Sequence, residues 1–210
     1  MIPGSGLILI DKPVDLSSAA VVSRVKKKLK GRKTGHAGTL DPFATGLLPI
    51  CFGRATKLIE RIRTGRKGYR AELTLGISTD TQDCTGEIVE QSEVPGELDL
   101  DELDRACQSF KGKIWQTPPM YSAKKVDGKR LYDLARQNKM VERNPVEITI
   151  YGISVIKVEL PRIVFDVECG EGTYVRTLGF DLAAKLGFPG MLSGLIRTRV
   201  GRFLLEDAVK

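Results

Sequence analysis

The sequence contains a single histidine, His36, among its 210 residues. Motifs that need two or more histidines are therefore excluded, and no Gly-x-Gly-x-x-Gly or Walker phosphate-binding loop is present. The four cysteines are scattered without a Cys-x-x-Cys pair, so they form neither a zinc spacing nor a disulfide framework and predict free thiols in a reducing compartment. We therefore expect chemistry by carboxylate, tyrosine and arginine side chains, with no metal and no cofactor.

Long apolar runs are also absent, and residues 7–10 are the only four consecutive large apolar residues near the N-terminus. This pattern predicts neither a membrane-spanning helix nor a secretory signal, so we expect a cytoplasmic protein without a membrane partner. Lys and Arg number 33 against 26 Asp and Glu, which leaves a net charge of +7. A basic balance favours a polyanionic partner, because cationic side chains that contact phosphates release counterions.

Hydrophobic periodicity predicts a mixture of helices and alternating strands. Helices are expected from Ser17 or Ser18 to about Leu29, from Asp99 to about Phe110, and at residues 131–137 and 175–186. Strands are expected at residues 7–10, 69–75, 147–159 and 163–169. Because alternation of period two implies a sheet with unlike faces, we predict an α+β fold with a mixed, mainly antiparallel sheet.

The most informative segment is residues 35–49, with the sequence GHAGTLDPFATGLLP. Glycines and prolines surround one acid, Asp41, an arrangement that fixes an unusual backbone path and presents a carboxylate from a turn. An Asp-Pro pair alone merely starts a turn. The whole string, however, resembles the catalytic motif of TruB-type tRNA pseudouridine synthases, whose core reads G-H-x-G-x-L-D-P-x-A-x-G-x-L.

Further blocks that resemble this family follow in the same order along essentially the full chain. They are DKP at 11–13, GRATK at 53–57, KGY at 67–69, PPMYSAK at 118–124, GTYVRT at 172–177 and LIRTRVG at 195–201. Three positions depart from the family pattern: Asp15 stands for glycine, Ser17 for threonine and Arg202 for proline. The resemblance implies the pseudouridine-synthase fold, with helices and insertion loops flanking the sheet, as a single catalytic domain over residues 1–210. It also implies an RNA-gripping insertion at about 124–146, and the end of the chain at Lys210 predicts no C-terminal PUA domain.

The resemblance implies three catalytic residues. Asp41 would break the bond between C1′ and N1 of the uridine, either as a nucleophile at C1′ or as a base at the 2′ position. Tyr69 would stack on the target base and handle the proton on C5. Arg176 would pair with Asp41 and keep it ionised in a desolvated site.

The resemblance also implies substrate-binding residues. His36 would fill the space that a flipped uridine leaves, or stack on a neighbouring base. Tyr174 and Leu195 either line the uracil pocket or belong to the ordinary core. Lys12, Lys67 and Lys124 are the remaining substrate-binding candidates, and the basic residues of the 124–146 insertion would contact phosphates.

Two other polar groups have simpler interpretations. The basic residues between Lys26 and Lys33 fit a solvated helix face as well as they fit direct RNA contact. Asp80 and Asp83 lie in a Thr-Asp-Thr-Gln-Asp turn without further ligands nearby, so we interpret them as structural residues and predict no metal site.

Three functions remain open from the sequence. The first is a stand-alone, monomeric enzyme that makes the T-loop pseudouridine of tRNA (position 55 in standard tRNA numbering) from a flipped uridine of the T-arm. The second is a guide-RNA-dependent pseudouridylase, and the chain lacks the long basic extensions of that class. The third is a tRNA-folding chaperone without chemistry, against which the joint presence of Asp41, Tyr69 and Arg176 counts. We therefore predict the first function.

Overall fold

The computed structural model describes residues 4–122, 125–126, 129–130 and 141–210. Lys124 and the predicted helix at 131–137 lie outside these residues. The chain divides into two compact units. Unit 1 comprises Met1–Arg70, Val167–Glu171 and Gly194–Lys210, and unit 2 comprises Ala71–Asp166 and Gly172–Ser193. The single catalytic domain over residues 1–210 stays a prediction.

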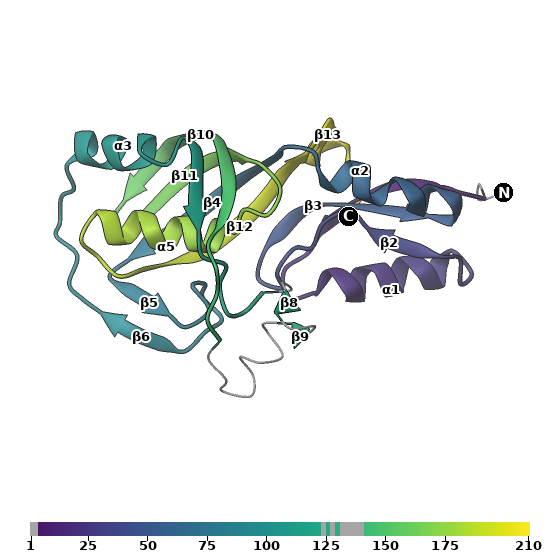
Figure 1. The fold of residues 1–210 in the computed structure, drawn as a ribbon, viewed down its shortest axis with the longest axis horizontal. Helices are drawn as coiled ribbons and strands as arrows, with labels where there is room; N and C mark the ends of the chain where they lie inside the picture. The colour runs from purple at the N-terminus through teal and green to yellow at the C-terminus, as the bar shows by residue number, and fades with distance from the viewer. Residues whose placement is uncertain (1–3, 123–124, 127–128, 131–140) are drawn as a thin grey trace. The chain divides into compact units, whose positions relative to one another are not determined.

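Unit 1 is built around strand β3 (Thr45–Phe52), whose residues after Thr45 are all buried. β3 pairs antiparallel with β1 (Gly6–Lys12) and with the short β2 (Thr34–His36), and it pairs parallel with β12 (Gly190–Val200). Helix α1 (Ser18–Lys28) lies alongside β2 and β3 (Figure 1). The 3-10 helix η1 (Gly53–Leu58) and helix α2 (Ile59–Arg63) follow β3, and β13 (Phe203–Leu204) and η2 (Leu205–Asp207) end the chain.

Helix α1 forms where the sequence predicts it. The Ser17 side chain caps the helix by accepting a hydrogen bond from the Ala20 amide (3.1 Å), which satisfies one of the donors that a helix N-terminus leaves free. Val21 packs on Leu48 and Ile50 of β3, and so attaches the apolar side of the helix to the sheet. The predicted helix is therefore confirmed, together with its start.

The described residues of unit 2 form two two-stranded sheets, two helices and further strands. β5 (Ile77–Thr79) pairs with β6 (Ile88–Gln91), β7 (Gly112–Gln116) pairs antiparallel with β10 (Val146–Glu159), and β8 (Lys125–Val126) pairs with β9 (Lys129–Arg130). Helices α3 (Leu100–Gln108) and α5 (Val175–Lys185) confirm two further predictions. Asp99 caps α3 by accepting from the amides of Asp101 and Glu102.

Three strands have residues in both units: β4 (Lys67–Leu75), β11 (Arg162–Cys169) and β12. The main sheet has the strand order β1-β3-β12-β4-β11-β10-β7. The pairs β1–β3, β2–β3, β7–β10 and β12–β13 are antiparallel, and β3–β12 is parallel. The predicted α+β class with a mainly antiparallel sheet is confirmed. β3 and β12 were not predicted as strands.

Within the described part of the chain, every helix is too short or too polar to cross a bilayer.

The contact between β3 and β12 requires glycine at position 46. Gly46 has a φ of +98°, and a Cβ built there would lie 2.5 Å from the carbonyl oxygen and 2.8 Å from the nitrogen of Arg197. Gly31, just after α1, also has a positive φ (+80°), but a Cβ there would meet no atom within 4 Å. The two glycines therefore share a backbone conformation that disfavours other residues and differ only in steric surroundings.

We predict that Gly46→Ala lowers the free energy of unfolding by about 1–3 kcal/mol more than Gly31→Ala, because only the first substitution forces two strands apart. Denaturant unfolding of both variants measures this difference. Equal losses in the two variants would contradict the close approach of β3 and β12.

Candidate active site

Asp41 lies in the loop between β2 and β3 of unit 1, with its side chain half-buried. The residue before it is held by the N-terminus of α1: the Ser18 hydroxyl donates to the Leu40 carbonyl (3.0 Å) and accepts from the Leu40 amide (2.8 Å). Within the loop, the Ala44 amide donates to the Asp41 carbonyl (3.2 Å). These bonds give Asp41 a defined backbone position despite the absence of regular secondary structure.

The guanidinium of Arg197 holds this loop from the side of β12. Its Nε donates to the Leu47 carbonyl (2.8 Å), and its two terminal nitrogens donate to the carbonyls of Thr39 (3.1 Å) and Gly38 (3.0 Å). Arg197 is only 1% exposed. Because its partners lie on both sides of Asp41, Arg197 clamps both ends of the loop. No role was predicted for Arg197 from the sequence, although it is the first arginine of the LIRTRVG block.

Lys12, at the end of β1, joins the segment after β1 to the loop of Asp41, which it reaches by one of its three bonds. Its ammonium donates to the carbonyls of Pro13 (2.8 Å), Leu16 (2.7 Å) and Pro42 (3.2 Å). Burial lowers the pKa of Lys12 to about 8, although the charge of Asp41 acts in the opposite direction. The side chain is fully buried, so these contacts describe a loop-holding residue, and a direct contact with RNA stays a prediction.

Tyr69, on β4, is brought to the same part of unit 1. Burial raises the pKa of the Tyr69 phenol to about 12, and the negative charge of Asp41 adds to this shift. Arg197 opposes it through its charge and a hydrogen bond. The resting phenol is therefore protonated at neutral pH. Leu195, on β12, is also buried, and its place in a uracil pocket stays a prediction.

His36 and Lys67 have different surroundings. His36 ends β2, half-buried, and its Nδ1 has no hydrogen-bond partner among the described residues. Burial and the charge of Arg197 lower the His36 pKa, so the imidazole is neutral at neutral pH. The ammonium of Lys67 donates to the carbonyls of Arg63 (2.8 Å), the last residue of α2, and Gly65 (3.4 Å). Base contacts by His36 and RNA contacts by Lys67 stay predictions.

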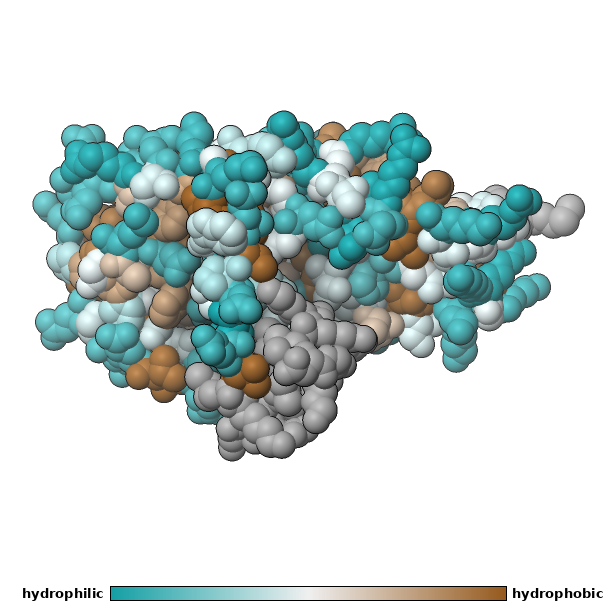
Figure 2. Space-filling view, in the orientation of Figure 1, coloured by the Kyte–Doolittle hydropathy of each residue, from teal (hydrophilic) through white to brown (hydrophobic). Residues whose placement is uncertain are grey.

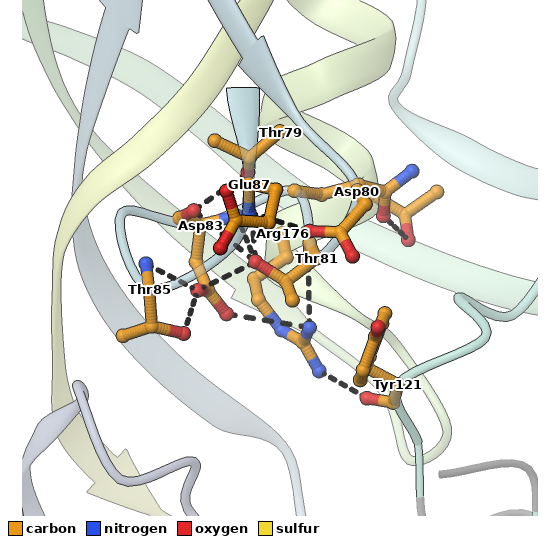
Figure 3. A network of polar contacts seen from close by, with 10 residues as sticks. Thr79, Asp80, Thr81, Asp83, Thr85, Glu87, Tyr121 and Arg176 are labelled. Carbon is orange, nitrogen blue, oxygen red and sulfur yellow. Dashed lines mark hydrogen bonds and ion pairs between the residues drawn. The ribbon is translucent and has the colours of Figure 1, made fainter. Parts of the chain in front are cut away.

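Arg176 is the centre of a polar network in unit 2 (Figure 3). It is 3% exposed, and its guanidinium donates to the carbonyls of Thr81 (2.7 Å) and Tyr121 (2.8 Å). The carboxylate of Asp83 lies 3.4 Å from the same guanidinium. Pairing of Arg176 with Asp41, which belongs to unit 1, stays a prediction.

Asp83 is oriented toward Arg176 by the turn in which it lies. One of its carboxylate oxygens accepts from the Thr81 hydroxyl (2.9 Å) and from both the amide (3.0 Å) and hydroxyl (2.6 Å) of Thr85. Asp80, in the same turn, accepts from the Glu87 amide (2.9 Å). The structural role predicted for these acids is therefore visible in their contacts, and Asp83 adds an ion pair that turn chemistry alone did not indicate.

The backbone of Tyr174 is fixed just before α5. Its amide donates to the side-chain oxygen of Gln116 (2.8 Å), and the Gln116 side-chain nitrogen donates back to the Tyr174 carbonyl (3.0 Å). Gln116 is buried, and it too was not singled out from the sequence. Within the described residues, no three His, Cys, Asp or Glu side chains gather into a group that could hold a metal ion.

The model of the family described as "TruB family pseudouridylate synthase (N terminal domain)" matches residues 26–175. The chain belongs to the TruB family. It is 49% identical over 205 residues to tRNA pseudouridine synthase B of Alkaliphilus oremlandii (strain OhILAs), a match that covers 98% of this chain and 68% of that protein. It is 46% identical over 208 residues to tRNA pseudouridine synthase B of Bacillus subtilis (strain 168), covering 97% of this chain and 67% of that protein.

Solved structures also resemble this TruB family member. One is described as the crystal structure of a Cbf5-Nop10-Gar1 complex, with a TM-score of 0.73, 30% sequence identity and coverage of 95% of this chain. The chain spans half of that solved chain and about two thirds of the curated relatives. The family resemblance predicted from residues 35–49 is therefore confirmed.

We predict that the Tyr69 phenol of this TruB family member ionises near pH 12, about two units above an ordinary tyrosine. Burial disfavours the phenolate, so between pH 10 and 12 an unfolded chain would lose this proton while the folded chain retains it. Phenolate absorbance recorded against pH, for the wild type and for Tyr69→Phe, isolates this group. A step near pH 10 that the variant lacks would show that Tyr69 is not desolvated.

Proposed function

We propose that the chain isomerises uridine to pseudouridine in tRNA, at the T-loop uridine (position 55 in standard tRNA numbering). The observation that carries the proposal is the loop of Asp41. Ser18, Lys12 and Arg197 hold it in place and present one half-buried carboxylate, whose charge acts on the pKa of the Tyr69 phenol. The family membership supports the reaction class, and the names of the two relatives described above support tRNA as the substrate.

The reaction breaks the C1′–N1 bond, rotates the detached uracil and joins C1′ to C5, so that the product is an isomer of the substrate. Asp41 would start it, either by attacking C1′ or by removing a proton at the 2′ position. The uracil must stay bound between the two steps, because its loss would turn isomerisation into hydrolysis. A closed, desolvated pocket serves this purpose by fixing the orientation of both fragments.

Tyr69 would supply the ring against which the uracil stacks. Its phenol is protonated at neutral pH, so it is a poor proton acceptor in the resting protein. A role in removing the C5 proton would need a lower pKa, and Arg197 is the neighbour that acts in that direction. Arg176 would pair with Asp41 and favour its ionised form.

The proposed substrate is the T-arm of tRNA, acted on by a monomer in the cytoplasm. The uridine must leave its stack before a carboxylate can reach C1′, and His36 would occupy the space it leaves. Lys124 and the other basic residues of the 124–146 insertion would contact phosphates. A guide-RNA-dependent enzyme is the alternative, and the identity of 49% to a tRNA pseudouridine synthase against 30% to the Cbf5 complex favours the stand-alone reaction.

We predict that the purified chain, in EDTA and without added cofactor, forms pseudouridine at the T-loop uridine of an unmodified tRNA transcript. Asp41→Asn should slow product formation by at least roughly 10⁴-fold, because it removes the group that starts the reaction. Carbodiimide labelling followed by primer extension measures the product under single-turnover conditions.

Asp15→Asn is the matched control, because Asp15 is an exposed aspartate of the same unit whose positive φ (63°) an asparagine tolerates. It should leave the rate close to that of the wild type. A wild-type chain that binds the transcript and forms no product would rule out the stand-alone reaction and favour the guided or chaperone functions.

A further inference from the structure

Positive charge is unevenly distributed between the two units. Unit 1 contains 19 Lys and Arg against 8 Asp and Glu, a net charge of +11, whereas unit 2 contains 14 against 18, a net charge of −4. All of the chain's excess of +7 therefore comes from the unit that also contains Asp41. A single-sign field of this kind attracts polyanions to unit 1.

Within unit 1, the charge is concentrated in and just after α1. Residues 16–40 contain seven cations and no acid. Six of the cations are exposed and make no ion pair with any described residue; we call them the α1 cationic face, and they are Arg24, Lys26, Lys27, Lys28, Lys30 and Lys33. Figure 2 shows hydrophilic side chains at the surface over α1 and α2, with hydrophobic side chains between them.

Helix stability explains only part of this charge. Cations in the last turn of a helix interact favourably with the helix dipole, by about 0.3–1 kcal/mol each, and this applies to Lys26, Lys27 and Lys28. Lys30 and Lys33 lie beyond the helix, and like charges four residues apart within it, such as Arg24 and Lys28, repel each other. A face that served solubility alone would mix both signs of charge. The absence of acids from residues 16–40 therefore favours a polyanionic ligand.

The position of the α1 cationic face relative to Asp41 is fixed inside unit 1. Ser18, the first residue of α1, forms two hydrogen bonds with Leu40, the residue before Asp41. The helix has 11 residues and is therefore about 16 Å long at about 1.5 Å per residue. Its cationic end lies about one helix length from the contact with Leu40, too far to touch a uridine held at Asp41.

We propose that the α1 cationic face binds backbone phosphates of the substrate RNA several nucleotides from the reacting uridine. The contact uses charge and carries no base recognition, so it adds affinity that salt weakens. This inference rests on the proposed function for the identity of the ligand. The residues of the α1 cationic face would bind the RNA, and they are distinct from the proposed catalytic residues.

The test uses a variant in which Lys26, Lys27, Lys28 and Lys30 are all replaced by Gln, a residue of similar helix propensity. A control for the change in charge replaces four exposed lysines of unit 2, Lys111, Lys113, Lys157 and Lys185, by Gln. Lys113 and Lys157 make surface ion pairs and Lys185 lies over the Phe110 ring, contacts that contribute little at the surface. A second variant replaces the four α1 lysines by Arg and keeps the charge. Binding of an unmodified tRNA transcript is measured at several salt concentrations, and unfolding midpoints show that each variant is folded.

We expect the α1 Gln variant to bind at least about tenfold more weakly than the wild type. The slope of log affinity against log salt should fall by about 0.7–0.9 for each phosphate that the variant no longer binds. The single-turnover rate at saturating protein should be unchanged, because Asp41 and its loop are intact. The unit 2 control and the Arg variant should bind like the wild type.

Wild-type affinity and salt slope in the α1 Gln variant would overturn the proposal, and so would an equal loss of affinity in the unit 2 control. Failure of the proposed function is seen separately, as absence of pseudouridine from a transcript that the wild type binds. The binding measurements decide the role of α1 in either case.

Discussion

The arrangement of unit 1 depends on one buried cation, the guanidinium of Arg197. Burying an arginine side chain strongly destabilises the folded state unless its N–H groups donate hydrogen bonds to acceptors in the protein. Here three carbonyl groups accept from it, and all three belong to the segment around Asp41. The chain can therefore bury Arg197 only when that segment adopts the observed path, which couples the fold of β12 to the position of the candidate catalytic carboxylate.

The same principle applies to the other polar groups around the loop. Lys12 is fully buried, and its ammonium donates hydrogen bonds to three carbonyls. The Ser18 hydroxyl both donates to and accepts from the backbone of Leu40. Lys12 and Arg197 therefore place two buried positive charges against the loop of Asp41. The buried arginine of unit 2, Arg176, is also surrounded by acceptors: it donates to two carbonyls and forms an ion pair with the carboxylate of Asp83.

Local signals explain which elements could be predicted from the sequence. Helices α1 and α3 have side-chain caps, and β4, β10 and β11 contain alternating segments, so a few neighbouring residues suffice to identify them. β12 lacks such a signal, because a buried arginine occupies a position where an apolar residue would mark the inner face. Asp41 was found from its motif, and its role in catalysis stays a prediction.

The residues that position the site could not be predicted for a related reason. Arg197 lies 150 to 159 residues from the carbonyls that it binds, and Gln116 lies 58 residues from Tyr174. Their partners are backbone groups, which are the same at every position of a sequence and leave no pattern of residue types. Only the folded chain shows which carbonyls converge on which side chain.

Amide hydrogen exchange of residues 37–47 tests this dependence most directly, in the wild type and in Arg197→Lys. A lysine cannot reproduce three bonds from a planar guanidinium, so these amides should exchange faster in the variant while those of unit 2 keep wild-type rates. Arg199→Lys, two residues further along β12 and half-buried, should leave the segment unchanged. Wild-type exchange of residues 37–47 in Arg197→Lys would contradict the conclusion that Arg197 holds the loop of Asp41.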